Sequence, residues 1–210
     1  MISLPFSVTL LSLLTLLVYL GFGQRVLDRM RLNSSTALLI LGLMIIGHFL
    51  PTVPLGANLA LNLGALVPLG VVLYLLLTTS NQEQQRALLI SALTALFIVL
   101  SDKVLPPDPG LLDPVFSGGI FAGILAYLWG RSRRSAFIAA ILGVLIADLV
   151  ALVQLRTEQV PQKIILGAGG LFSSLVISPF LAVIIAEVTG EILEYLHNKA
   201  KLGQGGDDHE

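Results

Sequence analysis

Long apolar stretches separated by short polar segments run along nearly the whole chain. Each stretch approaches the roughly 20 residues that an α-helix needs to cross the hydrocarbon core of a bilayer. The pattern therefore predicts an all-α fold, a polytopic integral membrane bundle of about seven transmembrane helices. The predicted spans are residues 4–22, 35–50, 57–79, 87–105, 115–130, 136–155 and 164–186.

Composition supports this class of protein and excludes several others. Hydrophobic residues make up 55% of the chain and charged residues 12%, a balance that a soluble domain with a charged surface rarely shows. The net charge of −1 and the scattered basic residues argue against nucleic-acid binding. Without cysteine there is no disulfide, thiolate nucleophile or cysteine-based metal site. The first apolar run lacks a preceding Lys or Arg and a convincing cleavage site, so we expect a retained span.

The basic residues predict the orientation in the cell (inner or plasma) membrane. If seven spans alternate, nine basic residues lie on one side and three on the other. By the positive-inside rule, the side with nine faces the cytoplasm, so the N-terminus is outside and the C-terminus is cytoplasmic. The nine are Arg25, Arg29, Arg31, Arg86, Arg131, Arg133, Arg134, Lys199 and Lys201, and the three are Lys103, Arg156 and Lys163.

The last three spans carry small residues at intervals of four. Such stripes allow the close helix contacts that drive association in lipid, so we expect these spans to pack tightly. Ordinary packing explains the stripes at least as well as a gating surface does. They comprise Gly118, Ala122, Ala126 and Gly130, then Ala139, Gly143, Ala147 and Ala151, and finally Gly170, Ser174 and Ser178.

Asp148 is the most informative residue, because it interrupts an apolar run inside the sixth span. A carboxylate near the bilayer centre costs roughly 2.5–3.5 kcal/mol, so it should face protein or water. At 1.5 Å per residue, Asn62, Asp148, Ser173 and Ser174 fall at similar depths and could form one polar intramembrane site. The alternative is that Asp148 only forms structural hydrogen bonds with Asn62 or a serine.

Prolines predict where helices break. Pro68 lies inside the third span, where it removes a backbone donor and frees a carbonyl one turn earlier. Such a break can coordinate ions, although many proline kinks only bend a helix. Asn58 and Asn62 are expected on one face of this helix. Pro51 and Pro54 follow the short second span, which is therefore predicted to be tilted, broken or re-entrant.

The domain organisation follows from the same pattern. Residues 1–190 are predicted to form the transmembrane bundle, residues 191–202 a cytoplasmic helical extension, and residues 203–210 a disordered tail. The extension has an acidic start and a basic end. It is either a solvated helix end or a surface for a partner.

Three segments carry a resemblance to a known family. Residues 62–75, 143–149 and 166–172 resemble, in order and spacing, motif regions of the bacterial and archaeal multi-pass membrane proteins called domain of unknown function 1614. The resemblance covers most of the chain and implies a shared fold, with no established activity. The family pattern places Gly-Ala-Asp in the sixth span and Phe-Asp-Gly in the last. Here Asp148 follows Ala147 without that glycine, and Ser173 and Ser174 follow Phe172, so the second carboxylate is missing.

These observations favour small-solute or ion handling through the polar site around Asp148. The alternative is a non-catalytic membrane scaffold or assembly factor, and a third is a degenerate intramembrane aspartyl-protease-like protein. Enzyme activity is disfavoured, because an aspartyl protease needs two close carboxylates and no other catalytic, phosphate-binding or metal-binding motif occurs. No cofactor is predicted. The expected partners are the lipid bilayer, a small ion or solute, and a second copy or another membrane protein.

Overall fold

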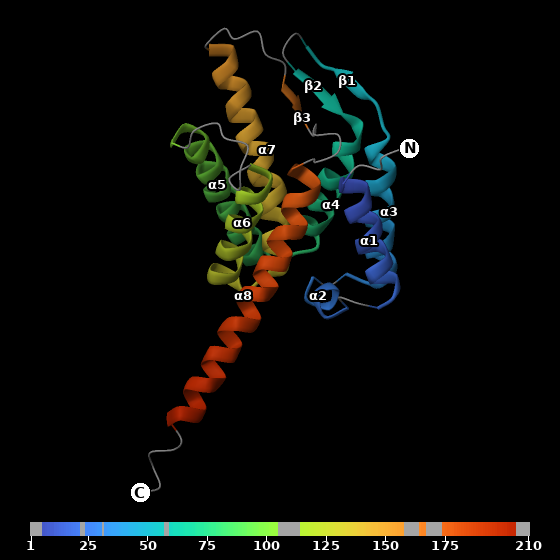
Figure 1. Cartoon of the computed structure of the whole chain (residues 1–210). Coiled ribbons are helices and arrows are strands. Elements are labelled where there is room, and N and C mark those ends of the chain that lie inside the picture. The colour runs from blue at the N-terminus through green and yellow to red at the C-terminus, as the bar shows by residue number, and fades with distance from the viewer. Residues whose placement is uncertain are drawn as a thin grey trace, which may run out of the picture.

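The computed structural model describes residues 6–21, 24–30, 32–56, 59–104, 114–157, 164–166 and 174–204. These residues form a predominantly helical protein with a small sheet at one end (Figure 1). The helices are α1 (Phe6–Tyr19), α2 (Gln24–Arg29), α3 (Ser34–His48), α4 (Leu66–Leu77), α5 (Asn81–Val104), α6 (Pro114–Gly130), α7 (Arg133–Thr157) and α8 (Ser174–Gln204). The strands are β1 (Thr52–Pro54), β2 (Leu59–Asn62) and β3 (Ile164–Leu166).

Helix α7 forms the centre of the bundle. It packs against α5, α6 and α8, and also contacts α4 (Figure 1). Within the most apolar 18 residues of α7, 56% of the residues are buried, compared with 33% for the corresponding part of α5. The side chains from Ala136 to Ile141 are almost completely buried, so the first half of α7 contacts protein on every side.

The small-residue stripes lie at the helix contacts, as predicted. A methyl group added at Gly143 would lie 2.7 Å from Cγ2 of Thr94 on α5, and one added at Gly118 would lie 2.9 Å from Cδ1 of Ile98 on α5. Beside the stripe, one added at Gly119 would lie 2.7 Å from the carbonyl oxygen of Ser178 on α8. Ala122, Ala126 and Ser178 are fully buried. The helix backbones therefore approach too closely for larger side chains. Gly170 lies outside the described residues.

The predicted third span is only partly helical. Residues 59–62 form β2, which is antiparallel to β1 and parallel to β3, and a 3₁₀ turn (Leu63–Ala65) leads into α4. The Asn62 side chain accepts a hydrogen bond from the Gly64 backbone N–H at 2.8 Å. Gly64 also packs directly on the Gly47 carbonyl at the end of α3. This local hydrogen bond competes with helix formation, and strand pairing satisfies the backbone that leaves the helix.

The last predicted span is corrected in the same way. Its first residues, Ile164–Leu166, form β3, and helix α8 begins only at Ser174. Because β2 and β3 pair in parallel, the two segments that lead into α4 and α8 start side by side in the sheet (Figure 1).

Two helices are long and apolar enough to cross a membrane, Asn81–Val104 and Arg133–Gln154. Three shorter apolar helices, Ser34–Gly47, Leu63–Leu77 and Ser117–Trp129, accompany them within the described residues. Seven full crossings remain a prediction.

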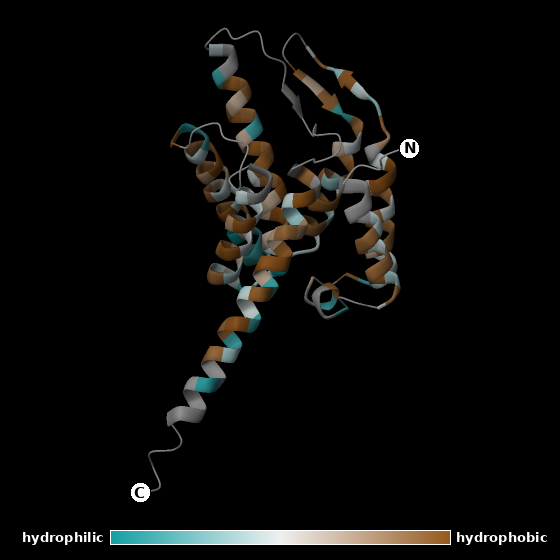
Figure 2. Ribbon diagram, viewed as in Figure 1, coloured by the Kyte–Doolittle hydropathy of each residue, from teal (hydrophilic) through white to brown (hydrophobic). Residues whose placement is uncertain are grey.

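The remaining elements lie beside or beyond this core. Helices α1 and α3 pack on each other and form a pair at the side of the bundle, with α2 below them in Figure 1. Helix α8 continues to Gln204 and projects away from the bundle at the end that carries α2. Figure 2 shows hydrophobic residues throughout the bundle and more hydrophilic ones along this projection. Of the predicted tail, residues 205–210 lie outside the described part of the chain.

Replacing Gly143 with alanine should destabilise the protein by about 1–3 kcal/mol, because the new methyl group overpacks the contact between α5 and α7. Gly42→Ala is the matched control, since a methyl group there meets nothing within 4 Å. It should be neutral or stabilise by up to about 1 kcal/mol through helix propensity. Thermal melting in detergent measures both, and equal melting temperatures would contradict the close contact.

Candidate functional site

Asp148 lies on the inward face of α7. Val144 and Leu152, one turn before and after it, are 3% and 8% exposed, whereas its neighbour Leu149 is 50% exposed. The Asp148 side chain itself is half-buried. Within the described part of the chain its carboxylate makes no hydrogen bond and no ion pair. A carboxylate in this position lacks the partners that normally offset its burial.

The inward face of α7 is directed toward the segments where the sheet gives way to helix. Val144 shares a buried cluster with Ala65 and Leu175, and Leu61 packs against this cluster. Strand β3 also contacts α7. Leu61 precedes Asn62, and Leu175 follows Ser174, but this cluster also includes Phe137 and Met30, so it does not place Asn62 or Ser174 beside Asp148. The shared polar site of these residues stays a prediction.

The structure describes two of the three residues predicted to accompany Asp148, namely Asn62 and Ser174. Asn62 is half-buried, and its side-chain oxygen already accepts the Gly64 hydrogen bond. It ends a strand, so the prediction that Asn58 and Asn62 share a helical face is wrong. Ser174 is the first residue of α8, and Ser173 lies outside the described residues, as does Asn58.

The three prolines predicted to break helices lie outside helix interiors, whereas Pro179 lies inside α8. Pro68 lies in the first turn of α4, where the missing backbone donor costs nothing, and the break in the apolar stretch comes earlier, at Leu63–Ala65. Pro51 follows the end of α3 and its carbonyl accepts from the Leu63 backbone N–H at 3.2 Å. Pro54 ends β1, an edge strand, which is where a sheet tolerates proline.

A second polar cluster, which we call the arginine junction, lies where α7 begins. Arg133 and Arg134 are only 6% and 3% exposed. Arg133 forms an ion pair with Glu187 of α8, with 2.7 Å between its Nε and Oε2 of the carboxylate. Its guanidinium carbon lies 5.7 Å from the centre of the Tyr127 ring, and Gly190 leaves room for the head group. Two buried cations at the positive end of a helix dipole require such partners.

Arg134 binds the C-terminal end of α4. Its Nη2 donates to Oγ1 of Thr78 at 2.7 Å and its Nη1 to the Thr78 carbonyl at 3.3 Å. Thr78 caps the C-terminus of α4, where the helix dipole is negative and favours a cation. Ser132 donates to the Glu83 carboxylate and accepts from the Ser135 backbone N–H at 3.2 Å. The arginine junction thus joins α4, α5, α7 and α8.

Sequence reasoning treated these arginines only as markers of orientation. The signal that could have identified the arginine junction is the pair Arg133-Arg134 immediately after an apolar span, together with Glu187 at the end of the last one. A grouping of three or more potential metal ligands is absent from the described residues.

The geometry defines a helical bundle held by close small-residue contacts, with one half-buried carboxylate in its central helix and a buried arginine junction at the end of that helix. The chain belongs to the family described as Protein of unknown function (DUF1614), whose family model matches residues 26–185. The matched segment contains Asp148, the three strands, and the arginine junction except for Glu187 and Gly190 of α8. No curated protein and no solved structure matches the chain.

Replacing Glu187 with alanine should cost about 3–5 kcal/mol, because it leaves the buried Arg133 cation without its counter-charge. Glu194→Ala, on the exposed part of α8, should change stability by no more than about 0.5 kcal/mol. The double variant Arg133→Met with Glu187→Leu should recover much of the loss, since neither charge then remains. Melting temperatures in detergent measure all three, and a harmless Glu187→Ala would show that the ion pair is structurally unimportant.

Proposed function

We propose that this protein is an integral membrane protein that handles a small cation or solute through the carboxylate of Asp148. The apolar lengths of α5 and α7 support the membrane location, and the three shorter apolar helices extend the same character around them. The positive-inside count supports a cytoplasmic arginine junction and C-terminus, with the sheet at the outer side.

The observation that carries the proposal is the state of Asp148 itself: a half-buried carboxylate on the inward face of an apolar helix, without a partner among the described residues. The contrast with the arginine junction is informative, because there the buried charges of the same helix have partners. A carboxylate with a structural role would be expected to have a hydrogen-bond or ion-pair partner as well. An intramembrane carboxylate left available is suited to bind a proton or a cation.

The broken segments beside α7 add support. Transporters commonly place their binding residues where helices are interrupted near the middle of the membrane, since irregular backbone is tolerated only within protein or a wet cavity. Here β2 with its 3₁₀ turn leads into α4, and β3 precedes α8. Helix α7 contacts α4, α8 and β3, so we propose that these interrupted segments contribute to the site around Asp148.

One observation favours the scaffold alternative. The projecting part of α8 exposes an apolar stripe: Val188, Ile192, Tyr195 and Leu196 are 48–66% exposed. A cytoplasmic partner could cover this stripe. The scaffold reading differs from ion handling in one respect, because it assigns no role to the charge of Asp148.

The topology can be tested with single cysteines in this cysteine-free chain. Thr52→Cys in β1 and Ser80→Cys before α5 are both exposed positions at opposite ends of the bundle. In intact cells an impermeant thiol reagent should label Thr52→Cys and leave Ser80→Cys unlabelled, and both should react after lysis. The reverse pattern would overturn the proposed orientation.

Asp148→Asn should leave folding intact, since the amide keeps the shape and much of the hydrogen bonding, but should abolish ion handling. The assay is the decay of an imposed proton, Na⁺ or K⁺ gradient in proteoliposomes. The wild-type protein should dissipate one of these gradients faster than empty vesicles. Asp28→Asn, an exposed carboxylate on α2, is the matched control and should behave as wild type.

Two outcomes would count against ion handling. If wild type and empty vesicles give the same decay for all three cations, the proposed activity is absent. If the wild-type protein conducts and Asp148→Asn conducts equally well, the carboxylate is structural. Loss of stability in Asp148→Leu, with a silent Asp148→Asn, would then identify it as a hydrogen-bonding residue.

A further inference from the structure

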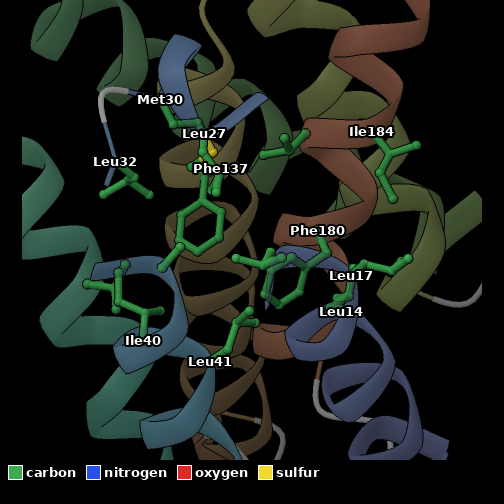
Figure 3. A pocket seen from close by; sticks show the side chains of 14 residues that line it. Leu14, Leu17, Leu27, Met30, Leu32, Ile40, Leu41, Phe137, Phe180 and Ile184 are labelled. Atoms are coloured by element: carbon green, nitrogen blue, oxygen red, sulfur yellow. The ribbon is translucent and has the colours of Figure 1, made fainter. Parts of the chain in front are cut away.

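A wholly apolar cavity separates the α1–α3 pair from the central helices. Its volume is about 240 Å³. Figure 3 shows the side chains that line it. Its walls come from six helices and include Leu14 of α1, Leu41 of α3, Phe137 of α7 and Phe180 of α8. The rings of Phe137 and Phe180 meet edge to face, with 6.0 Å between their centres, and form one wall. Every lining side chain is a hydrocarbon or a thioether.

The size and chemistry of the cavity limit what can occupy it. A dry apolar cavity of about 150 Å³ accommodates benzene, and sites for drug-sized ligands begin near about 300 Å³. This cavity lies between them, which suits a slender hydrocarbon and not a folded peptide segment. A polar group inside would find no hydrogen-bond partner, so the bound portion must be apolar.

The cavity is next to the basic end of the bundle. Phe137 lies one turn from Arg133, and Val183 lies one turn from Glu187, so its inner end adjoins the arginine junction. Leu27 of α2 and Met30 line it as well. Helix α2 contains two arginines and one aspartate in its sequence, a net charge of +1, so a basic helix borders the cavity. At the rim, Leu17 and Ile184 are 36% and 51% exposed, so the cavity opens between α1 and α8.

We propose that this cavity binds one acyl chain of an anionic phospholipid, whose head group is attracted to the basic helix α2. Lipid tails are as apolar as the cavity wall, so transfer of the chain from the bilayer gives little hydrophobic gain. The gain comes from van der Waals contacts in a space that would otherwise be a void, and from the attraction between the head group and the arginines. The inference rests on the membrane location proposed above and not on Asp148.

The test measures how added lipid changes the melting temperature of delipidated protein in detergent. Phosphatidylglycerol should raise it, and phosphatidylcholine with the same chains should raise it less. Leu41→Trp fills the cavity from α3, where Leu41 is 4% exposed. Leu43→Trp, on the same helix and 44% exposed, is the matched control. The lipid-dependent shift should disappear in Leu41→Trp and persist in Leu43→Trp.

Native mass spectrometry should show about tenfold less bound phosphatidylglycerol for Leu41→Trp, because the indole takes the space of the chain.

Further variants separate the possible outcomes. Without lipid, Leu41→Trp should melt no lower than wild type, since it fills a void; if it does not fold, Ala37→Leu replaces it. Arg25→Gln with Arg29→Gln should abolish the preference for phosphatidylglycerol. Asp148→Asn should keep the full lipid response, so failure of the lipid proposal can be distinguished from failure of ion handling.

Two results would overturn the proposal. One is an equal lipid-dependent shift of the melting temperature in Leu41→Trp and wild type. The other is a dimer that Leu41→Trp converts to monomer, because the cavity would then lie between copies.

Discussion

The close contact of α7 with α5 determines where the other elements lie. At Gly143 the two helices approach so nearly that a single added methyl group would meet Thr94. In the membrane location that we propose, lipid would offer no hydrophobic force to press helices together, so stability would depend on such contacts and on interhelical polar groups. With α7 held in the centre, it packs against α4 and α8, and its first turn meets the C-terminus of α4 at Thr78 and the middle of α8 at Glu187. The contacts of Arg133 and Arg134 follow from this arrangement.

The charged residues at the start of α7 have bonding partners, whereas Asp148, further along the helix, has none among the described residues. At the start, Arg133 and Arg134 are buried but bound, one to Glu187 and the other to the C-terminus of α4. Further along, Asp148 is half-buried and has no partner in the described part of the chain. Burial of a charge is expensive in both places, and only the first arrangement offsets that cost within the protein. This asymmetry is why we assign a structural role to the arginines and a functional one to the carboxylate.

The sequence could predict the helices but not the sheet. Apolar runs long enough to be helices are visible locally, and α1, α3, α5, α6 and α7 lie close to their predicted bounds. The pairing of β2 with β3 depends on residues about a hundred positions apart, such as Ala60 and Ile165, which no local pattern relates. The turn at Asn62 and Gly64 was misread because hydropathy does not register an asparagine that binds its own backbone.

The candidate site was found only in part for the same reason. Asp148 was visible because a charge interrupts an apolar run, and the family model covers it. The partners of Arg133 and Arg134 come from other helices, so burial of these residues could not be anticipated from the loop in which they seemed to lie. The apolar cavity has no sequence signature at all, since its leucines and phenylalanines resemble those of any core.

The central claim, that water and small ions reach Asp148 within the membrane, is tested most directly by thiol accessibility at that position. Asp148→Cys and Leu149→Cys can each be treated with a small charged thiol reagent in membranes. Leu149 is 50% exposed on the outward face of α7, where lipid would surround it. The account predicts that Cys at position 148 reacts and Cys at position 149 does not, because thiolates form only where water reaches. An unreactive cysteine at position 148 would contradict it.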